Sequence, residues 1–380
     1  MKRLKVLTLV GTRPELIKLS RVIAALDAAT DHVLVHSGQN FDPELSQVFF
    51  DELEIRPPDH LLGVAGGTVA EQIARIIERA DVVLAQERPD ALLIYGDTNT
   101  GLAVIPAKRR HIPVFHMEAG NRCFDQRVPE ETNRKIIDHL ADINLPLTEH
   151  ARRYLLAEGL RPETVIKTGS TLKEVLGHYR RKVDASDVRK RLGLVAGEYF
   201  VVSAHREENV DSLSNLSDLL ASLRALVEVF GHRVIVSTHP RTRQRLEVLA
   251  AEGAHPEDPR IEFLKPFGFC DYIRLQRDAA CVLSDSGTLT EESSLLGFPA
   301  VTIRQAHERP EGMDEGTLVM SGLGPERVLQ AVTLVQEQSR AGFRPRPVPD
   351  YDVDNVSQKV VRIIVSYVDY VNRTVWGQPS

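Results

Sequence analysis

Val6-Leu7-Thr8-Leu9-Val10-Gly11-Thr12-Arg13-Pro14-Glu15 joins a mostly apolar run to a glycine turn and a helix start. The run predicts a buried strand, and Gly11 permits a tight turn where that strand ends. Pro14 suits one of the first positions of a helix. Arg13, and Lys18 beyond it, are then expected near a helix N-terminus, where anions are favoured. The alternative is an ordinary turn with a surface cation.

Short apolar runs of the same kind recur along the chain, with helical patterns between them. They cover residues 6–10, 32–36, 91–95, 113–116, 143–147, 164–167, 199–203, 234–237, 261–264, 281–284 and 300–303. Their hydrophobicity is continuous rather than alternating, which predicts strands buried on both faces and therefore parallel sheets. We expect an α/β, doubly wound fold with two Rossmann-like domains.

Domain boundaries follow from this series of strands. We expect a first Rossmann-like domain over residues 1–172 and a second over 173–354, because a new strand series begins after a charged helical stretch. Residues 213–229 carry a helical stripe of leucines. Residues 353–376 also have helical periodicity, and a helix of about 355–380 could pack back on the first domain.

Composition excludes several classes of protein. The chain has 380 residues, of which 42% are hydrophobic, so a disordered or collagen-like chain is excluded. A net charge of −6 argues against nucleic-acid or anionic-membrane partners. Three widely spaced cysteines without a C-x-x-C pair favour a reducing cytoplasm and argue against a structural zinc site. The chain contains no run of 18 apolar residues, so we expect no transmembrane helix.

Carboxylates follow the predicted strands of the first half. Asp97 comes after Tyr95-Gly96, and Glu118 comes after His116-Met117. Glu130 follows a proline, and Arg134 lies one helical turn further on. Helix capping could account for Asp97 and for one of the two neighbouring glutamates. Three such carboxylates exceed what capping needs, and paired carboxylates can supply a general base and a general acid.

The second half places hydrogen-bond donors after its strands. His205 and Arg206 can donate to a phosphate, and the main-chain N–H groups of Ser286 and Gly287 suit a diphosphate at a helix start. Glu292, one turn into that helix, could accept from ribose hydroxyls. A serine N-cap with acidic residues in the first turn is the competing interpretation. The ligand implied is a nucleotide diphosphate with a sugar attached, held between two domains.

These motifs together resemble the non-hydrolysing UDP-N-acetylglucosamine 2-epimerases, in the same order and over almost the whole chain. The matching motifs are Gly-Thr-Arg-Pro-Glu with Lys18, Gly96-Asp97, Glu118-Ala119-Gly120, Pro129-Glu130-Glu131 with Asn133-Arg134, His205-Arg206, Asp285-Ser286-Gly287 with Glu291-Glu292, and Glu308-Arg309-Pro310-Glu311. The resemblance implies a glycosyltransferase-B type fold with its active site in the interdomain cleft. It also implies a cytoplasmic homodimer that needs neither a metal nor another cofactor.

The resemblance also implies roles for individual residues. The family's catalytic positions fall on Asp97, Glu118, Glu130 and His205. Its UDP-sugar binding positions fall on Arg13, Lys18, Arg134, Arg206, Ser286, Gly287 and Glu292. Thr288 stands where the family often has a second glycine, which could alter the approach of this loop to the diphosphate.

Residues 121–128 differ from the commonest members of the family. They are similar to a branch that serves capsule and O-antigen synthesis. That branch converts UDP-2-acetamido-2,6-dideoxy-L-talose to UDP-N-acetyl-L-fucosamine. The activity implied is C2 epimerisation by elimination and re-addition of UDP, on this sugar or on UDP-N-acetylglucosamine. Three alternatives remain open: a glycosyltransferase of the same fold, a hydrolysing epimerase and a nucleotide-sugar sensor.

Overall fold

The computed structural model describes residues 3–39, 50–238, 240–251, 258–305 and 308–378. The chain divides into two compact units. Unit 1 comprises Met1–His178 with Pro349–Ser380, and unit 2 comprises Tyr179–Val348. We expected a boundary between residues 172 and 173, at the start of helix α7 (Leu172–Ala185), but the division falls inside that helix. The chain returns to unit 1 at Pro349 rather than at residue 355.

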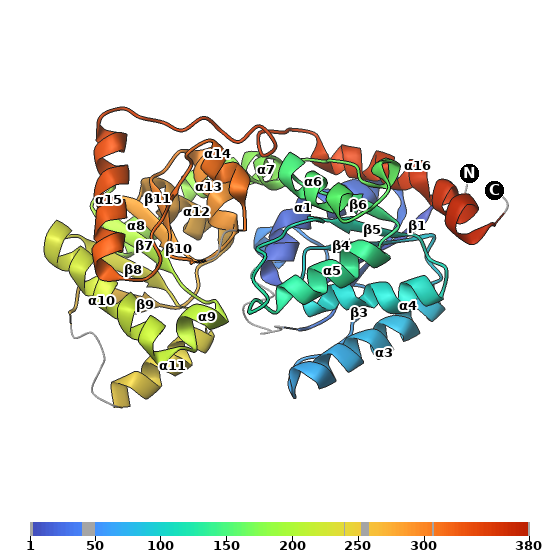
Figure 1. The fold of residues 1–380 in the computed structure, drawn as a ribbon, viewed down its shortest axis with the longest axis horizontal. Helices are drawn as coiled ribbons and strands as arrows, with labels where there is room; N and C mark the ends of the chain where they lie inside the picture. Colours follow the sequence, from blue (N-terminus) through green and yellow to red (C-terminus); the bar gives the residue numbers. More distant parts are fainter. Residues whose placement is uncertain (1–2, 40–49, 239, 252–257, 306–307, 379–380) are drawn as a thin grey trace. The chain divides into compact units, whose positions relative to one another are not determined.

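Unit 1 contains a six-stranded parallel sheet with the strand order β3-β2-β1-β4-β5-β6 (Figure 1). Its strands are β1 (Lys5–Val10), β2 (Asp31–His36), β3 (His60–Leu61), β4 (Ala91–Tyr95), β5 (Val114–Met117) and β6 (Ile143–Leu145). Its helices are α1 (Arg13–Ala29), α3 (Val69–Glu87), the short 3₁₀-helix η1 (Asn99–Ala103), α4 (Val104–Arg109), α5 (Glu130–Leu140), α6 (Glu149–Ala157), the 3₁₀-helix η2 (Pro162–Thr164) and α16 (Val356–Trp376). Helix α16, the predicted tail helix, packs against α1 in this unit.

Unit 2 contains a second six-stranded parallel sheet, with the order β12-β11-β10-β7-β8-β9. Its strands are β7 (Tyr199–Ser203), β8 (Arg233–Ser237), β9 (Ile261–Leu264), β10 (Cys281–Ser284), β11 (Ala300–Thr302) and β12 (Val319–Met320). Its helices are α8 (Val188–Arg191), α9 (Glu207–Val210), α10 (Leu213–Phe230), α11 (Pro240–Ala251), α12 (Phe269–Asp278), α13 (Thr288–Leu296), α14 (Pro310–Asp314) and α15 (Pro325–Arg340). Together the two sheets confirm the predicted α/β class with parallel strands.

Strand β7 shows why a continuous apolar run predicts a central parallel strand. Phe200 and Val202 pack with leucines of α10, whereas Tyr199 and Val201 pack with Leu275 of α12 and its neighbours. Successive side chains of a strand point to opposite faces, so both faces of β7 must be covered by helices. Burying a large apolar side chain on either face contributes about 1.5–3 kcal/mol.

One predicted strand is absent from the structure, and two short strands were not predicted. Residues 164–167 form no strand, because Val165 makes an isolated parallel bridge to Asn144 of β6 and the pairing extends no further. The two-residue strands β3 and β12 were not predicted, since two residues carry no periodicity.

None of the helices within the described residues is both long and apolar enough to cross a membrane.

Candidate functional site

Asp97 and Glu118 lie at the same edge of the unit 1 sheet. Tyr95 of β4 pairs with Met117 of β5, and each carboxylate follows directly beyond that pair. Gly96 has a φ of +70° and Glu118 has a φ of +62°. A left-handed backbone is uncommon for a residue other than glycine, so the turn after β5 holds Glu118 in a conformation that costs about 1–3 kcal/mol. Its Oε1 accepts from Nδ2 of Asn121 over 3.2 Å.

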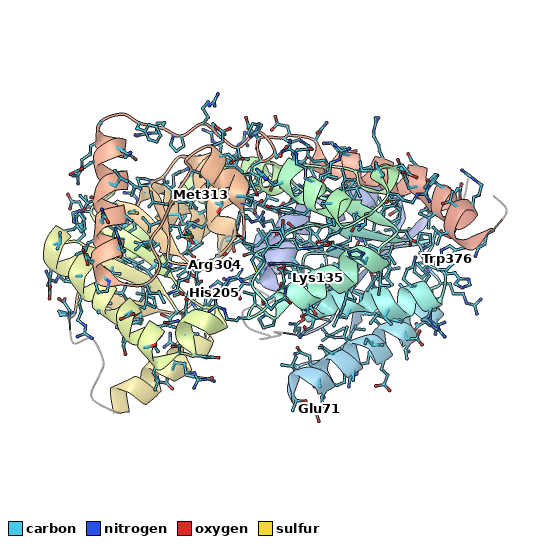
Figure 2. The ribbon with its side chains drawn as sticks, in the orientation of Figure 1. Glu71, Lys135, His205, Arg304, Met313 and Trp376 are labelled. Carbon is cyan, nitrogen blue, oxygen red and sulfur yellow. The ribbon has the colours of Figure 1, made fainter. Side chains whose placement is uncertain are left out.

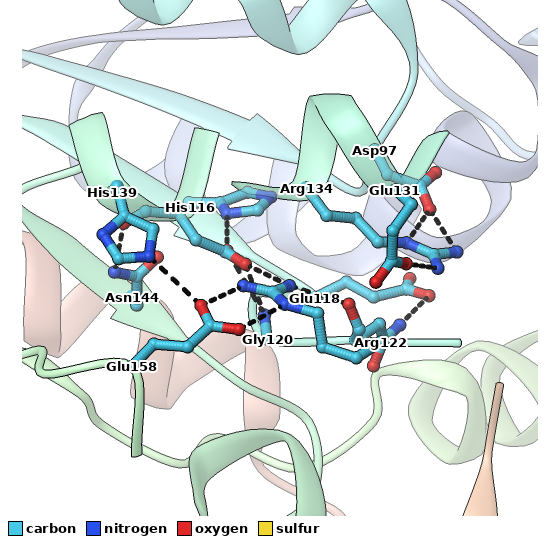
Figure 3. Close-up of polar contacts among 12 residues, drawn as sticks. Asp97, His116, Glu118, Gly120, Arg122, Glu131, Arg134, His139, Asn144 and Glu158 are labelled. Carbon is cyan, nitrogen blue, oxygen red and sulfur yellow. Dashed lines mark hydrogen bonds and ion pairs between the residues drawn. The ribbon is translucent and has the colours of Figure 1, made fainter. Parts of the chain in front are cut away.

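Helix α5 contributes the cation that faces Asp97. Nε of Arg134 donates to Oδ2 of Asp97 over 2.8 Å, and Nη1 donates to Oε2 of Glu131 over 2.9 Å (Figure 3). Asn133 donates to the main-chain oxygen of Asp97 over 3.0 Å. Arg134 and Glu131 are almost completely buried. Burial raises the pKa of Glu131, but the N–H of Cys123 and the Arg134 guanidinium hold it below its ordinary value.

The two adjacent glutamates of α5 therefore differ in their surroundings. Glu131 accepts hydrogen bonds from Arg134 and from the N–H of Cys123. Glu131 is therefore the glutamate with a structural role in the helix. Glu130 is the first residue of the helix and is partly exposed. Its position leaves it accessible to a ligand, as the predicted catalytic role requires.

Glu15 ties the first loop to the loop that carries Asp97. Its Oε2 accepts the N–H of Gly11 over 2.6 Å, and its Oε1 accepts from the hydroxyl of Thr98 over 2.8 Å. Burial raises the pKa of Glu15 to about 7. On the same helix, Arg13 is exposed at the first position and Lys18 is buried.

In unit 2, the buried carboxylate of Asp285 organises the loop after β7. Its Oδ2 accepts the main-chain N–H groups of His205 and Arg206 over 2.9 and 3.0 Å, and the side chain of Asn209 over 3.1 Å. Burial raises the pKa of Asp285, but His205 and these donors hold it far below the usual range. The His205 side chain is 41% exposed, so it can reach a ligand.

The start of α13 lies beside two charged side chains. A Cβ placed on Gly287 would lie 3.3 Å from Nε of Arg309 and 3.4 Å from Oε2 of Glu308. Glu308 also pairs with Arg304 and accepts from Nη2 of Arg206 over 2.8 Å. Figure 2 shows His205 and Arg304 in this unit. The absence of a side chain at Gly287 therefore allows the side chains of Glu308 and Arg309 to lie close to the start of α13.

The other predicted residues of this region have protein partners. Oγ of Ser286 accepts the N–H of Thr288 over 3.3 Å, so the hydroxyl serves the helix start. Glu292 accepts from Nε2 of Gln276 over 2.6 Å and is largely buried. A ribose would have to share Glu292 with Gln276.

The predicted residues thus fall into two sets. The first set lies in unit 1. It comprises Asp97, Glu118, Glu130 and Arg134 near the carboxyl ends of β4 and β5, together with Arg13 and Lys18 of α1. His205, Arg206, Ser286, Gly287 and Glu292 belong to unit 2. Reasoning from sequence assigned no role to Glu15, Asp285 or Glu308, although each stands in a quoted motif, and it assigned none to Asp138. Within the described residues, no group of three or more His, Cys, Asp or Glu side chains could hold a metal ion.

Comparison with known proteins identifies the family of the chain. The family model described as UDP-N-acetylglucosamine 2-epimerase matches residues 24–365. A solved structure described as UDP-N-acetylglucosamine 2-epimerase from Rickettsia bellii is 54% identical, with a TM-score of 0.92 over 99% of this chain and 100% of that one.

Relatives from other organisms extend the likeness. The UDP-N-acetylglucosamine 2-epimerase of Methanocaldococcus jannaschii is 31% identical over 95% of this chain and 99% of its own. Its structure in complex with UDP-GlcNAc and UDP has a TM-score of 0.89, over 96% of this chain and all of that one. The UDP-2,3-diacetamido-2,3-dideoxy-D-glucuronate 2-epimerase of Pseudomonas aeruginosa is 30% identical over 86% of this chain and 91% of its own. The chain belongs to the UDP-N-acetylglucosamine 2-epimerase family and is an isomerase.

Proposed function

We propose that this protein inverts C2 of a UDP-2-acetamido-2-deoxy sugar without hydrolysing it. The observation that carries the proposal is the pair Asp97 and Glu118 beyond the paired ends of β4 and β5, next to the start of α5 with Glu130. A base and an acid are needed on opposite faces of C2, and neighbouring carboxylates in different surroundings can supply both. Membership of the epimerase family supports the same reaction.

The chemistry explains why two kinds of residue are needed. The hydrogen on C2 is not acidic, because no carbonyl adjoins C2, so it becomes removable only as the C1–O bond to UDP breaks. The electrons of that bond leave with UDP, and the C2–H electrons form the C1–C2 double bond of a glycal. A carboxylate takes the proton. UDP then adds back to C1, and a proton is delivered to the other face of C2.

Each set of residues has a part in these steps. Departing UDP gains negative charge, which His205, Arg206 and the N–H groups at the start of α13 stabilise. Asp97, Glu118 and Glu130 exchange the C2 proton. Arg134 keeps Asp97 oriented through the 2.8 Å contact. Arg13 and Lys18 add positive charge for the nucleotide, and Glu292 contacts the ribose.

We infer that the native sugar is UDP-2-acetamido-2,6-dideoxy-L-talose and that its product is UDP-N-acetyl-L-fucosamine. Residues 121–128 connect Glu118 to the helix that begins at Glu130, and Asn121 contacts Glu118 directly. A segment so close to the proposed proton-transfer groups borders the sugar rather than the uracil. The resemblance of this segment to the capsule and O-antigen branch supports the assignment. It also supports a homodimer that acts in the cytoplasm in the synthesis of a surface polysaccharide.

The experiment follows C2 by proton NMR in heavy water, with the two UDP-sugars in parallel. We expect the C2 proton to exchange, with the 6-deoxy-L-talose substrate reacting faster. Burying an unmatched 6-hydroxyl adds to the roughly 1–3 kcal/mol that an apolar pocket discriminates by itself. Faster exchange with UDP-N-acetylglucosamine would overturn the substrate. Release of free sugar would indicate a hydrolysing epimerase, and absence of exchange with either sugar would overturn the epimerase proposal.

A further inference from the structure

A buried polar cluster surrounds Asp138 of α5. Figure 3 shows its members His116, Gly120 and Arg122. Asp138 is completely buried. Its Oδ1 lies 2.9 Å from Nδ1 of His116, and its Oδ2 accepts from Nη1 of Arg122 over 2.7 Å. Both oxygens are 3.2 Å from the N–H of Gly120. Burial raises the pKa of Asp138, but His116 and Arg122 hold it below its ordinary value, so the carboxylate is ionised.

His116 extends this cluster to the neighbouring strand. Its Nε2 donates to the main-chain oxygen of Gly96 over 2.7 Å. A carbonyl and an ionised carboxylate both only accept, so the ring satisfies both contacts when each nitrogen carries a hydrogen. Asp138, His116 and Gly96 therefore form one chain of hydrogen bonds from α5 to the residue before Asp97.

The same carboxylate also holds the turn after β5. Gly120 lies two residues beyond Glu118 and has a φ of +83°. A Cβ there would lie 2.5 Å from the main-chain oxygen of Ala151, so only glycine fits. The N–H of Gly120 points at Asp138, which fixes the turn that gives Glu118 its left-handed backbone. One buried side chain is thus bonded toward both carboxylate loops.

We propose that Asp138 and His116 are positioning residues that set the placement of Asp97 relative to Glu118. This inference rests on the proposed epimerase function, because it concerns the groups that exchange the C2 proton. Proton transfer depends on donor–acceptor distances of about 2.6–3.2 Å, and supporting side chains must hold such groups within about 0.5 Å. We call the hydrogen bonds from Asp138 through His116 to Gly96 the bridge. Loss of the bridge should therefore lower kcat, whereas UDP should still bind.

Asp142 provides a matched control at the opposite end of the same strand. It is also a buried aspartate that follows α5, and its Oδ2 accepts the N–H of Val114, the first residue of β5, over 2.9 Å. Its other oxygen pairs with Lys108. Asp142→Ala removes a comparable buried pair and main-chain contact, but at the edge of the sheet away from Asp97 and Glu118. A merely structural role predicts equal effects for the two positions.

The test compares Asp138→Ala, Asp138→Asn, His116→Gln and Asp142→Ala in C2 exchange with the better of the two UDP-sugars, together with UDP affinity. We expect kcat to fall about 10- to 100-fold in Asp138→Ala and His116→Gln, with KM and UDP affinity within about threefold. Asp138→Asn should recover much of the loss, because its amide can accept from Gly120 and donate to a neutral His116. Asp142→Ala should keep kcat within about twofold.

Hydrogen–deuterium exchange of the protein separates this inference from the reaction. In Asp138→Ala, peptides spanning residues 93–99 and 116–122 should exchange faster. In Asp142→Ala, faster exchange should be confined to the start of β5. That result would support the bridge even if the wild-type protein turned over neither sugar. Unchanged kcat in folded Asp138→Ala and His116→Gln, or equal losses in Asp142→Ala, would overturn the positioning role. Unchanged exchange of both peptides would do the same.

Discussion

The carboxylate of Asp285 faces His205 with both of its oxygens: Oδ2 accepts the main-chain N–H of His205 over 2.9 Å, and Oδ1 lies 3.0 Å from its Nδ1. Asp285 is completely buried, whereas the His205 ring is partly exposed. The carboxylate therefore holds both the backbone and the ring of His205. A ring held in this way is preorganised to donate a hydrogen bond to a departing diphosphate.

Replacing Asp285 by Asn tests this relationship. The amide keeps the shape but removes the charge that faces His205, so we expect turnover to fall by roughly 100-fold, the lower end of the range for general acid–base groups. UDP binding should change much less. Asp258→Asn is a suitable control, because the Asp258 carboxylate in the same unit pairs with the neighbouring Arg260. Turnover equal to wild type in folded Asp285→Asn would show that the charge is not needed.

Replacing His205 by Ala should lower kcat more than it raises KM. A contact that strengthens as UDP departs acts on the transition state rather than on the bound substrate. His232→Ala serves as the control, since His232 lies against Phe200 in the same unit. A variant with a raised KM and an unchanged kcat would mean that His205 contributes equally to both states.

Glu130 and Glu131 offer a matched pair within one helix turn. Glu130→Gln should leave the fold and UDP binding intact and cut turnover by roughly 100-fold or more. Glu131→Gln should instead lower the free energy of unfolding by roughly 1–3 kcal/mol, because buried Arg134 loses a charged partner. Thermal unfolding and C2 exchange of both variants check the pair. The assignment fails if Glu131→Gln is the variant that stays stable and inactive.

The sequence predicts most of the fold because its central strands are buried on both faces. The run at 199–203 coincides with β7, and the leucine stripe at 213–229 lies within α10. Val165 and Ile166 form a short apolar run, yet nothing in the sequence indicates that the pairing with β6 ends after a single bridge. Local pattern reports burial, whereas the extent of pairing depends on a neighbouring strand.

The sequence was sufficient to place Asp97 and Glu118 at the carboxyl ends of two strands, because each follows an apolar run within two residues. Sequence could not separate Glu130 from Glu131, because their difference arises from contacts with Arg134 and Cys123 formed only in the folded chain. The bridge through His116 joins residues of different strands and α5. Such long-range hydrogen bonds leave no spacing by which the sequence could reveal them.

The pKa of Glu15 makes stability depend on pH in a testable direction. Burial raises it from 4.5 to about 7, although Gly11 and Thr98 donate to the carboxylate. Between these values Glu15 keeps a proton in the folded protein that it has lost in the unfolded chain. The contribution of Glu15 to the free energy of unfolding therefore falls as pH rises from about 5 to 8. Glu15→Gln mimics the protonated acid and removes this loss. Relative to wild type, the variant should therefore gain about 2–3 kcal/mol over that range. Urea unfolding at pH 5 and pH 8 measures the difference.

Glu131→Gln is the control, because the pKa of Glu131 is lowered and its contribution is lost only in more acidic solution. Parallel pH dependence in wild type and Glu15→Gln would show that Glu15 is ionised throughout.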